Sequence, residues 1–262
     1  MGNEVASEWE VEELLEAAEA WAIEAGELIM GYYGGRLAYE DKLDGTPVTA
    51  ADRGAENMLR ERIGTRFPTH AVLGEEYGES NPGARVRWVL DPVDATRSFM
   101  RGVPIFGVLI GIEVTGEPVV GIANFPALEE IIAAGQGLGC RWNGERCRVS
   151  TTDSIEESLV LTTDVENVLA RPEGPGYRRL QQRASFARTW GDCYGHCLVA
   201  TGRAEVMVDP EMASWDAAPF PILLSEAGGR FTSLEGAVTM HGKSGISTNG
   251  RLHEEVLREL TG

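Results

Sequence analysis

The sequence predicts a mixed α/β (α+β) protein in which helices pack against sheets. Near the N-terminus, apolar residues recur at helical spacing over 11–29. Two short apolar segments, 71–73 and 86–90, each run directly into acidic residues, as strands do at the edge of an open sheet where ligands bind. The stretch 105–149 is typical of an antiparallel meander.

The first two helices are predicted by their capping signals as well as by periodicity. Ser7 and Glu10 have the Ser-x-x-Glu form of a capping box ahead of the first helix. After a turn expected over 42–47, Thr49 is a suitable N-cap for the second helix, and Asp52 falls in its first turn. Asp52 is explained equally well as a carboxylate that stabilises the helix dipole. We expect this helix to end at Gly64 and Pro68.

The stretch from 86 to 96 has the most informative chemistry. Its apolar strand leads into Asp91-Pro92-Val93-Asp94. Proline has a fixed φ and no N–H, so Pro92 favours a rigid turn over a continuing strand. Such a turn can direct Asp91, Asp94 and the Val93 carbonyl at one point, and three hard oxygens suit a divalent cation such as magnesium. Taken alone, the motif also fits a solvated acidic turn.

Two further carboxylates follow strands or begin helices. Glu75 comes directly after strand 71–73 and would otherwise be explained as a solvated turn. Asp216 lies at the start of a helix that we expect to run from 215 to Gly228, with Pro221 shortening or kinking it.

The remaining elements are short and alternate between strands and helices. The Asn143-Gly144 pair is a strong hairpin signal inside the meander. Beyond it we expect a loop over 171–176, helices over 192–200 and 252–260, and strands over 158–163, 185–190, 206–208 and 247–249.

The composition restricts the partners. A formal net charge of −18 disfavours nucleic acid. It also disfavours a phosphate-bearing ligand unless bound cations reverse the local charge. No apolar run is long enough to span a bilayer, so no membrane association is expected. The acidic N-terminus lacks a secretory pattern, and we therefore expect a cytoplasmic protein.

The chain has four cysteines, at 140, 147, 193 and 197, and free thiols are the default without a secretory context. The spacing of Cys193 and Cys197, with His196 between them, is not a usual zinc pattern. Apolar packing of small side chains on a helix is the better explanation.

Taken together, the acidic motifs resemble those of the inositol monophosphatase family of magnesium-dependent phosphatases. The resemblance covers most of the chain, and its motifs are Gly74-Glu75-Glu76, Asp91-Pro92-Val93-Asp94-Ala95-Thr96, and Trp215-Asp216-Ala217-Ala218 followed by Glu226-Ala227-Gly228-Gly229. The segments 98–104 and 191–200 resemble the histidinol-phosphate phosphatase branch of the family most.

The resemblance implies a single domain, residues 1–262, with a layered αβαβα fold whose halves meet near residue 140. It implies two or three Mg²⁺ ions, one held by Glu75, Asp91 and the Val93 carbonyl and a second by Asp91, Asp94 and Asp216. The resemblance also implies that Asp52 and Thr96, together with Glu75, position and deprotonate a water. The N–H groups of Ala95 and Thr96 would hold phosphate oxygens. Asp192 and Asp209 would contact the substrate.

The implied substrate is a small phosphorylated metabolite, with histidinol phosphate first. Two carboxylates suit its cationic part. Asp209 is explained equally well as a turn residue before Pro210. Inositol 1-phosphate, fructose 1,6-bisphosphate and a 3′-phosphoadenosine nucleotide are alternatives, and the last two would use basic groups such as Arg97, Arg101 and Arg188. A non-catalytic binding protein on the same fold is a further alternative. Family members are commonly dimers, so a homodimer is expected.

One position departs from the family pattern, because Ala95 stands where the family has glycine. If this position needs a positive φ, alanine costs about 1 kcal/mol. If this position does not need a positive φ, the alanine costs little stability and its N–H can still bind phosphate.

Overall fold

The computed structural model describes residues 6–34, 39–41 and 47–262, so the turn expected over 42–47 lies almost entirely outside the described residues. The helices are α1 (Glu8–Met30), α2 (Ala50–Arg66), α3 (Thr96–Met100), η1 (Ile155–Glu157), α4 (Val165–Leu169), α5 (Gly174–Arg183), α6 (Asp192–Ala200), α7 (Ser214–Ala217), α8 (Phe220–Ala227) and α9 (His253–Thr261). The strands are β1 (Tyr39–Asp41), β2 (Pro47–Thr49), β3 (Ala71–Gly74), β4 (Gly78–Ser80), β5 (Val86–Asp94), β6 (Gly107–Val114), β7 (Glu117–Phe125), β8 (Glu130–Gly135), β9 (Gly139–Trp142), β10 (Glu145–Arg146), β11 (Leu159–Leu161), β12 (Phe186–Arg188), β13 (Val206–Asp209), β14 (Arg230–Thr232) and β15 (Gly245–Thr248).

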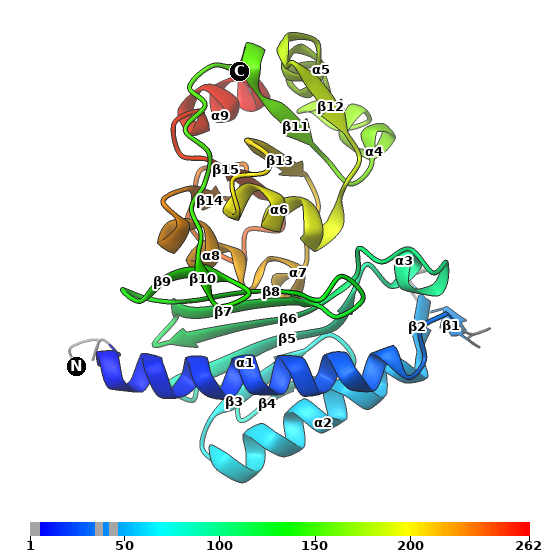
Figure 1. The fold of residues 1–262 in the computed structure, drawn as a ribbon, viewed down its shortest axis with the longest axis vertical. Helices are drawn as coiled ribbons and strands as arrows, with labels where there is room; N and C mark the ends of the chain where they lie inside the picture. The colour runs from blue at the N-terminus through cyan, green and yellow to red at the C-terminus, as the bar shows by residue number, and fades with distance from the viewer. Residues whose placement is uncertain (1–5, 35–38, 42–46) are drawn as a thin grey trace.

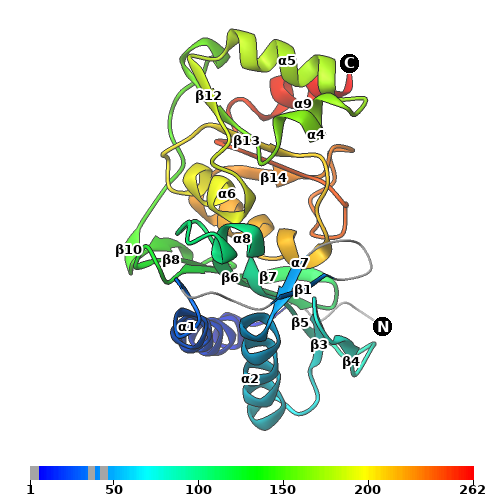
Figure 2. The ribbon, with the colours of Figure 1, turned by 90° about the vertical axis from the view of Figure 1, so that its right-hand side faces the viewer.

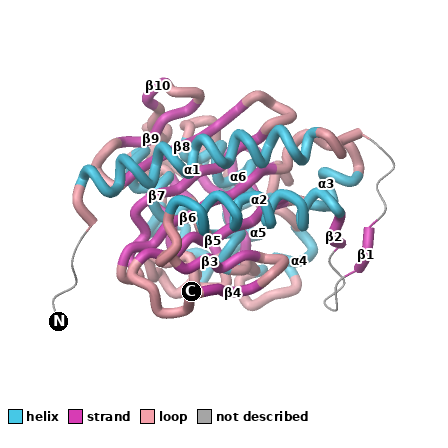
Figure 3. Tube along the Cα trace, turned by 90° about the horizontal axis from the view of Figure 1, so that it is seen from below, coloured by secondary structure: helices cyan, strands magenta, loops and turns pink. Residues whose placement is uncertain are grey.

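These elements form five layers, as Figures 1 and 2 show. Helices α1 and α2 lie side by side across one face of the larger sheet (Figure 3). Helices α6, α7 and α8 fill the space between the two sheets, and α4, α5 and α9 cover the outer face of the smaller sheet. The buried apolar residues divide into three clusters that follow these layers. The layered αβαβα prediction is confirmed.

Helices α1 and α2 begin where the capping signals predict. Ser7 accepts a hydrogen bond from the Glu10 N–H at 3.2 Å, and Thr49 and Asp52 form a complete capping box. Helix α2 ends between Gly64 and Pro68, as predicted: it continues through Gly64 to Arg66 and stops before Pro68. Among the described residues, no helix is long and apolar enough to cross a membrane.

Within the described residues the larger sheet has eight strands in the order β10-β9-β8-β7-β6-β5-β3-β4. The predicted antiparallel meander is confirmed by β6 to β10, while β3 runs parallel to β5. The expected end of β5 at residue 90 is wrong. The strand continues through Pro92, and its register on β6 shifts between Asp91 and Asp94. Proline is tolerated there because a bulge interrupts the ladder of hydrogen bonds.

The smaller sheet has the order β12-β11-β13-β15-β14, again for the described residues. Two expectations in this half are wrong. The segment 171–176 is not all loop, because α5 begins at Gly174 with Pro175 in its first turn, where a missing N–H costs little. The single helix expected over 215–228 is divided into α7 and α8, with Pro219 between them.

Two glycines bring the junction between α7 and α8 down onto the larger sheet. Gly111 on β6 pairs with Gly121 on β7. A Cβ at Gly111 would lie 2.5 Å from the Ala218 carbonyl oxygen, and one at Gly121 would lie 2.3 Å from that of Pro219. Only glycine permits this backbone approach, which sets the position of α7 over β5.

We therefore predict that Gly111→Ala destabilises the protein and moves α7 away from β5. Overpacking a close contact typically costs about 1–3 kcal/mol. Urea denaturation measures the change in the free energy of unfolding. Gly116→Ala serves for comparison: a Cβ at Gly116 would contact no other atom, but the residue has a φ of +86°. That variant therefore shows the cost of backbone strain without a steric clash. An unfolding free energy for Gly111→Ala equal to that of the wild type would contradict the proposed fit.

Candidate active site

Three aspartates converge between the larger sheet and α7. Asp91 and Asp94 lie at the bulged end of β5, and Asp216 lies on α7. One carboxylate oxygen from each falls within 4.8 Å of the others. Each side chain also accepts a backbone hydrogen bond, from the N–H of Val93 at 3.0 Å, Cys193 at 2.9 Å and Ala213 at 2.8 Å respectively. The backbone therefore fixes the direction of each carboxylate.

The electrostatics of this cluster favour a cation. Burial, followed by the charges of Glu75 and Asp94, raises the pKa of Asp91 well above its usual value. Burial, followed by the charge of Asp192, does the same to the pKa of Asp94. Burial raises the pKa of Asp216 to about 6. Carboxylates packed this closely resist ionising together unless a positive charge is present. The donor set consists of hard oxygens, which fits Mg²⁺ and not a thiolate-preferring metal.

Glu75 and Val93 border the cluster. Both line a hollow of about 570 Å³ together with the three aspartates. The Glu75 carboxylate lies outside the group of three oxygens within 4.8 Å, but its charge is close enough to raise the pKa of Asp91. The Val93 carbonyl accepts a hydrogen bond from the Thr96 hydroxyl at 3.1 Å. The structure thus brings all five predicted ligand residues to one place.

The expected pairing of Asp52 with Thr96 is present. The Thr96 hydroxyl lies 3.5 Å from Asp52 Oδ1, at the limit for a hydrogen bond. The same hydroxyl also donates to the Val93 carbonyl at 3.1 Å. The other oxygen of Asp52 accepts from the Thr49 N–H at 2.8 Å and the Thr49 hydroxyl at 2.5 Å. Asp52 is 1% exposed. Asp52 therefore joins the start of α2 to the start of α3, directly after β5.

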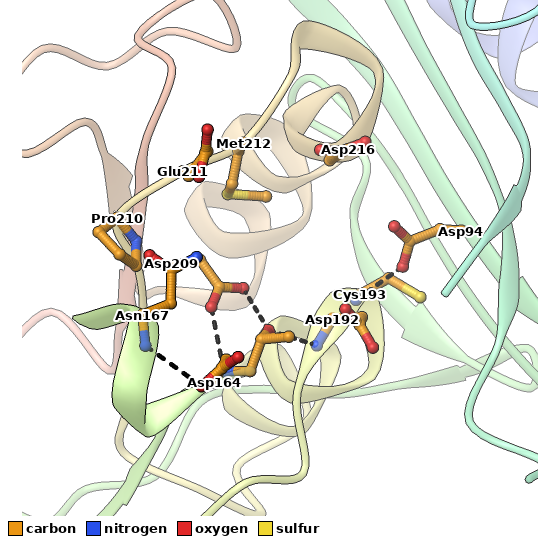
Figure 4. Close-up of a pocket in the computed structure, with 11 residues that line it drawn as sticks. Asp94, Asp164, Asn167, Asp192, Cys193, Asp209, Pro210, Glu211, Met212 and Asp216 are labelled. Carbon is orange, nitrogen blue, oxygen red and sulfur yellow. Dashed lines mark hydrogen bonds between the residues drawn. The ribbon is translucent and has the colours of Figure 1, made fainter. Parts of the chain in front are cut away.

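The two expected substrate residues lie in a recess of about 100 Å³ that adjoins the hollow (Figure 4). Asp192 begins α6, with a φ of 50°, and its N–H donates to Thr163 Oγ1 at 2.7 Å. Asp209 ends β13 and accepts from the Thr163 N–H at 3.1 Å and from its hydroxyl at 2.9 Å. The alternative of a turn residue before Pro210 is wrong, because Asp209 is the last residue of β13 and its buried side chain accepts both hydrogen bonds from Thr163.

Several residues of this region were not predicted from the sequence. Thr163, Asp164, Glu166 and Glu211 all line the hollow or the recess. The one available signal was that the expected strand 158–163 ends at Thr163-Asp164, as the other acidic strand ends do. Of the three basic residues considered, Arg97 lines the hollow, whereas Arg101 and Arg188 are not among the described residues that line it.

Comparison with known proteins agrees with this arrangement. The family model described as "Inositol monophosphatase family" matches residues 10–261. The histidinol-phosphatase of Chlorobaculum parvum is 41% identical over 94% of this chain and 96% of its own, and that of Mycobacterium tuberculosis is 38% identical over 86% and 88%. Among solved structures, the extragenic suppressor protein suhB of Bartonella henselae superposes with a TM-score of 0.87 at 27% identity, covering 95% of this chain and 98% of its own.

The fold, the acidic site and these relatives define an enzyme class, namely a phosphatase that hydrolyses phosphate monoesters. The chain belongs to the inositol monophosphatase family.

Ala95 adopts the left-handed conformation, with φ 63° and ψ 45°. Of the two possibilities left open by the sequence, the structure therefore supports the strained one. We predict that Ala95→Gly relieves this strain and raises the free energy of unfolding by up to about 1 kcal/mol, because the greater freedom of glycine in the unfolded chain offsets part of the gain. Urea denaturation measures the effect. A variant less stable than the wild type would show that Ala95 is not strained.

Asp192 is expected to make the metal-free protein less stable as the pH rises. Burial, followed by the charges of Asp209 and Asp216, raises the pKa of Asp192 to about 7, from a usual value of 3.8. The native carboxyl keeps a proton that the unfolded chain releases, so stability falls between about pH 4 and pH 7.

Asp192→Asn tests this expectation, since asparagine tolerates a positive φ and does not titrate. In EDTA, the stability of the variant relative to the wild type should increase with pH over this interval, as thermal unfolding measures. A difference that does not change with pH would contradict the raised pKa.

Proposed function

We propose that this phosphatase hydrolyses histidinol phosphate to histidinol and inorganic phosphate. The observation that carries the proposal is the acidic wall of the recess, where Asp192, Asp209 and Glu211 adjoin the aspartate cluster. Such a wall suits a leaving group with an amine and an imidazole, because charge-assisted hydrogen bonds to carboxylates are strong. The relatives named histidinol-phosphatase, which are 33–41% identical to this chain, support the same substrate.

We propose that the cluster holds two or three Mg²⁺ ions. Glu75, Asp91 and the Val93 carbonyl would hold one, and Asp91, Asp94 and Asp216 a second, with Asp91 shared. The fit rests on the convergence of hard oxygens and on the raised pKa values of Asp91 and Asp94, which a cation would relieve. When bound, these ions supply positive charge that polarises the phosphoryl group and lowers the pKa of a water.

The residues of the chain then have separate tasks. Glu75 would take a proton from the attacking water, and the linked side chains of Asp52 and Thr96 would hold that water in line with the phosphorus. The N–H groups of Ala95 and Thr96 would hold phosphate oxygens. In phosphoryl transfer most of the rate enhancement comes from positioning and charge, so the proposal needs neither a nucleophilic side chain nor a covalent intermediate.

On the leaving-group side, we propose that Asp192 contacts the substrate and that Asp209 acts partly through Thr163. Both carboxylate oxygens of Asp209 accept from Thr163, whose hydroxyl oxygen in turn accepts the Asp192 N–H. This chain of hydrogen bonds fixes the start of α6. Asp192 is therefore held where its carboxylate faces the recess (Figure 4).

The alternative substrates would be hydrolysed by the same chemistry, but they differ in the leaving group that the acidic wall of the recess would contact. The Thermotoga maritima relative, 32% identical, is named fructose-1,6-bisphosphatase/inositol-1-monophosphatase. A bisphosphate or a nucleotide would place a second anion against the wall, where Arg97 is the one basic residue among the described lining residues. Inositol 1-phosphate, whose leaving group is neutral, is the stronger alternative. The convergence of Asp94 and Asp216 on Asp91 disfavours a non-catalytic binding protein.

Because both halves of the chain contribute to the site, we propose that residues 1–262 act as one functional domain. The homodimer and the cytoplasmic location remain predictions.

Phosphate release from L-histidinol phosphate and from inositol 1-phosphate, each with Mg²⁺ and with EDTA, tests the proposal. We predict Mg²⁺-dependent release that is faster from histidinol phosphate, and no release in EDTA. The Asp192→Asn variant should raise KM for histidinol phosphate about tenfold, since one hydrogen bond to a charged group is worth about 1.5 kcal/mol or more. Its KM for inositol 1-phosphate should change little.

Preference for inositol 1-phosphate by the wild type would contradict the substrate assignment while leaving the metal site intact. Release that persists in EDTA would contradict the metal site itself.

A further inference from the structure

Glu56 is a buried carboxylate that the proposed mechanism does not use. It lies on α2, one turn after Asp52 on the same face of the helix, and it is fully buried. It is not among the residues that line the hollow or the recess. Burying a carboxylate is costly unless hydrogen bonds compensate it, so its partners indicate what it holds in place.

The partners of Glu56 belong to the turn between β3 and β4, directly after Glu75. Its Oε2 accepts from the Glu76 N–H at 2.7 Å, and its Oε1 accepts from the Tyr77 N–H at 3.2 Å. Arg60, one turn further along α2, donates to the same carboxylate at 2.7 Å.

Arg60 also extends around the turn. It donates to the Gly78 carbonyl, and to the Ser80 hydroxyl at 3.3 Å. The Glu56–Arg60 pair therefore holds the turn between β3 and β4 through hydrogen bonds to its backbone.

These contacts fix the backbone on both sides of Glu75. The Glu75 N–H donates to the Leu90 carbonyl on β5 at 3.3 Å. The peptide that follows Glu75 is held by the hydrogen bond from the Glu76 N–H to Glu56. When the peptides before and after a residue are both fixed, the direction of its Cα–Cβ bond is fixed as well. The Glu75 side chain is thereby directed at the hollow that it lines.

The close approach of Glu56 also explains Gly74. A Cβ at this position would lie 2.1 Å from Glu56 Oε1 and 2.4 Å from the carboxyl carbon. Gly74 does not have a positive φ, so the constraint is contact and not backbone conformation. Because Gly74 has no side chain, the Glu56 carboxylate can occupy the space beside it and contact the turn.

We propose that Glu56, braced by Arg60, is a positioning residue that holds Glu75 ready to bind a cation. The inference rests on the proposed role of Glu75 as a metal ligand. Through Asp52 and Glu56, helix α2 then contacts two parts of the site, the start of α3 after β5 and the turn after β3. Residues that orient metal ligands in this way typically change metal affinity about 10–100-fold when they are replaced.

Binding of Mn²⁺, followed as loss of the free-ion electron paramagnetic resonance signal, tests the proposal without an activity assay. Glu56→Gln keeps the size of the side chain but loses the charge-assisted acceptor. We expect Mn²⁺ affinity to fall about 10–100-fold, and the Glu76 and Tyr77 amides to exchange their hydrogens faster. Gly74→Ala should produce the same two effects with no change of charge, because the added Cβ displaces the Glu56 carboxylate.

Glu79→Gln is the matched control. It removes one negative charge from β4, where Glu79 pairs with Arg87 at 2.9 Å, and leaves the Glu76 and Tyr77 amides untouched. Its Mn²⁺ affinity should equal that of the wild type. Circular dichroism shows which variants are folded, and Gly74→Ala and Glu56→Gln each test the proposal independently of the other.

Wild-type affinity and wild-type amide exchange in folded Glu56→Gln or Gly74→Ala would overturn the proposal. An equal loss of affinity in Glu79→Gln would also overturn it, because charge alone would then explain the effect. Glu75→Gln separates this inference from the proposed function. If that variant binds Mn²⁺ as the wild type does, Glu75 is not a ligand, and the proposed metal site is at fault whatever the amides of the turn do.

Discussion

Burial and mutual repulsion of closely packed carboxylates dominate the electrostatics of the site. Asp91 is 2% exposed, and the charges of Glu75, Asp94, Asp216 and Asp52 all raise its pKa. A protein gains nothing in stability from such an arrangement, since each charge opposes the others and none is well solvated. The cluster is therefore best understood as a site for hard cations, and the surrounding fold as the framework that keeps these carboxylates together.

The framework comes from contacts between segments far apart in the chain. Gly111 and Gly121 let the α7–α8 junction rest on the larger sheet, which brings Asp216 over β5. The Cys193 N–H holds Asp94 from the other half of the chain. Beyond the site, Arg203 forms a two-pronged ion pair with Glu130 at 2.7 and 3.1 Å and so ties the loop after α6 to β8. The two parallel hydrogen bonds fix the orientation of the loop relative to the strand.

Local signals in the sequence were enough to predict some of these features. The N-cap at Thr49, with Asp52 in the first turn of α2, and the acidic ends of β3 and β5 depend on neighbouring residues alone, and the structure agrees with them. Features that depend on distant contacts were not predictable. Pro92 stays in β5 because β6 accommodates a bulge. Thr163 and Glu56 matter through partners 46 and 20 residues away, which no local pattern indicates.

We propose that the aspartate cluster binds the cations on which phosphate hydrolysis depends. Anomalous diffraction from crystals soaked in Mn²⁺ would locate these ions independently of any activity assay. We expect anomalous density between Asp91, Asp94 and Asp216, and a second site beside Glu75 that weakens in Glu56→Gln. Density at other surface carboxylates, with none at the cluster, would contradict this proposal.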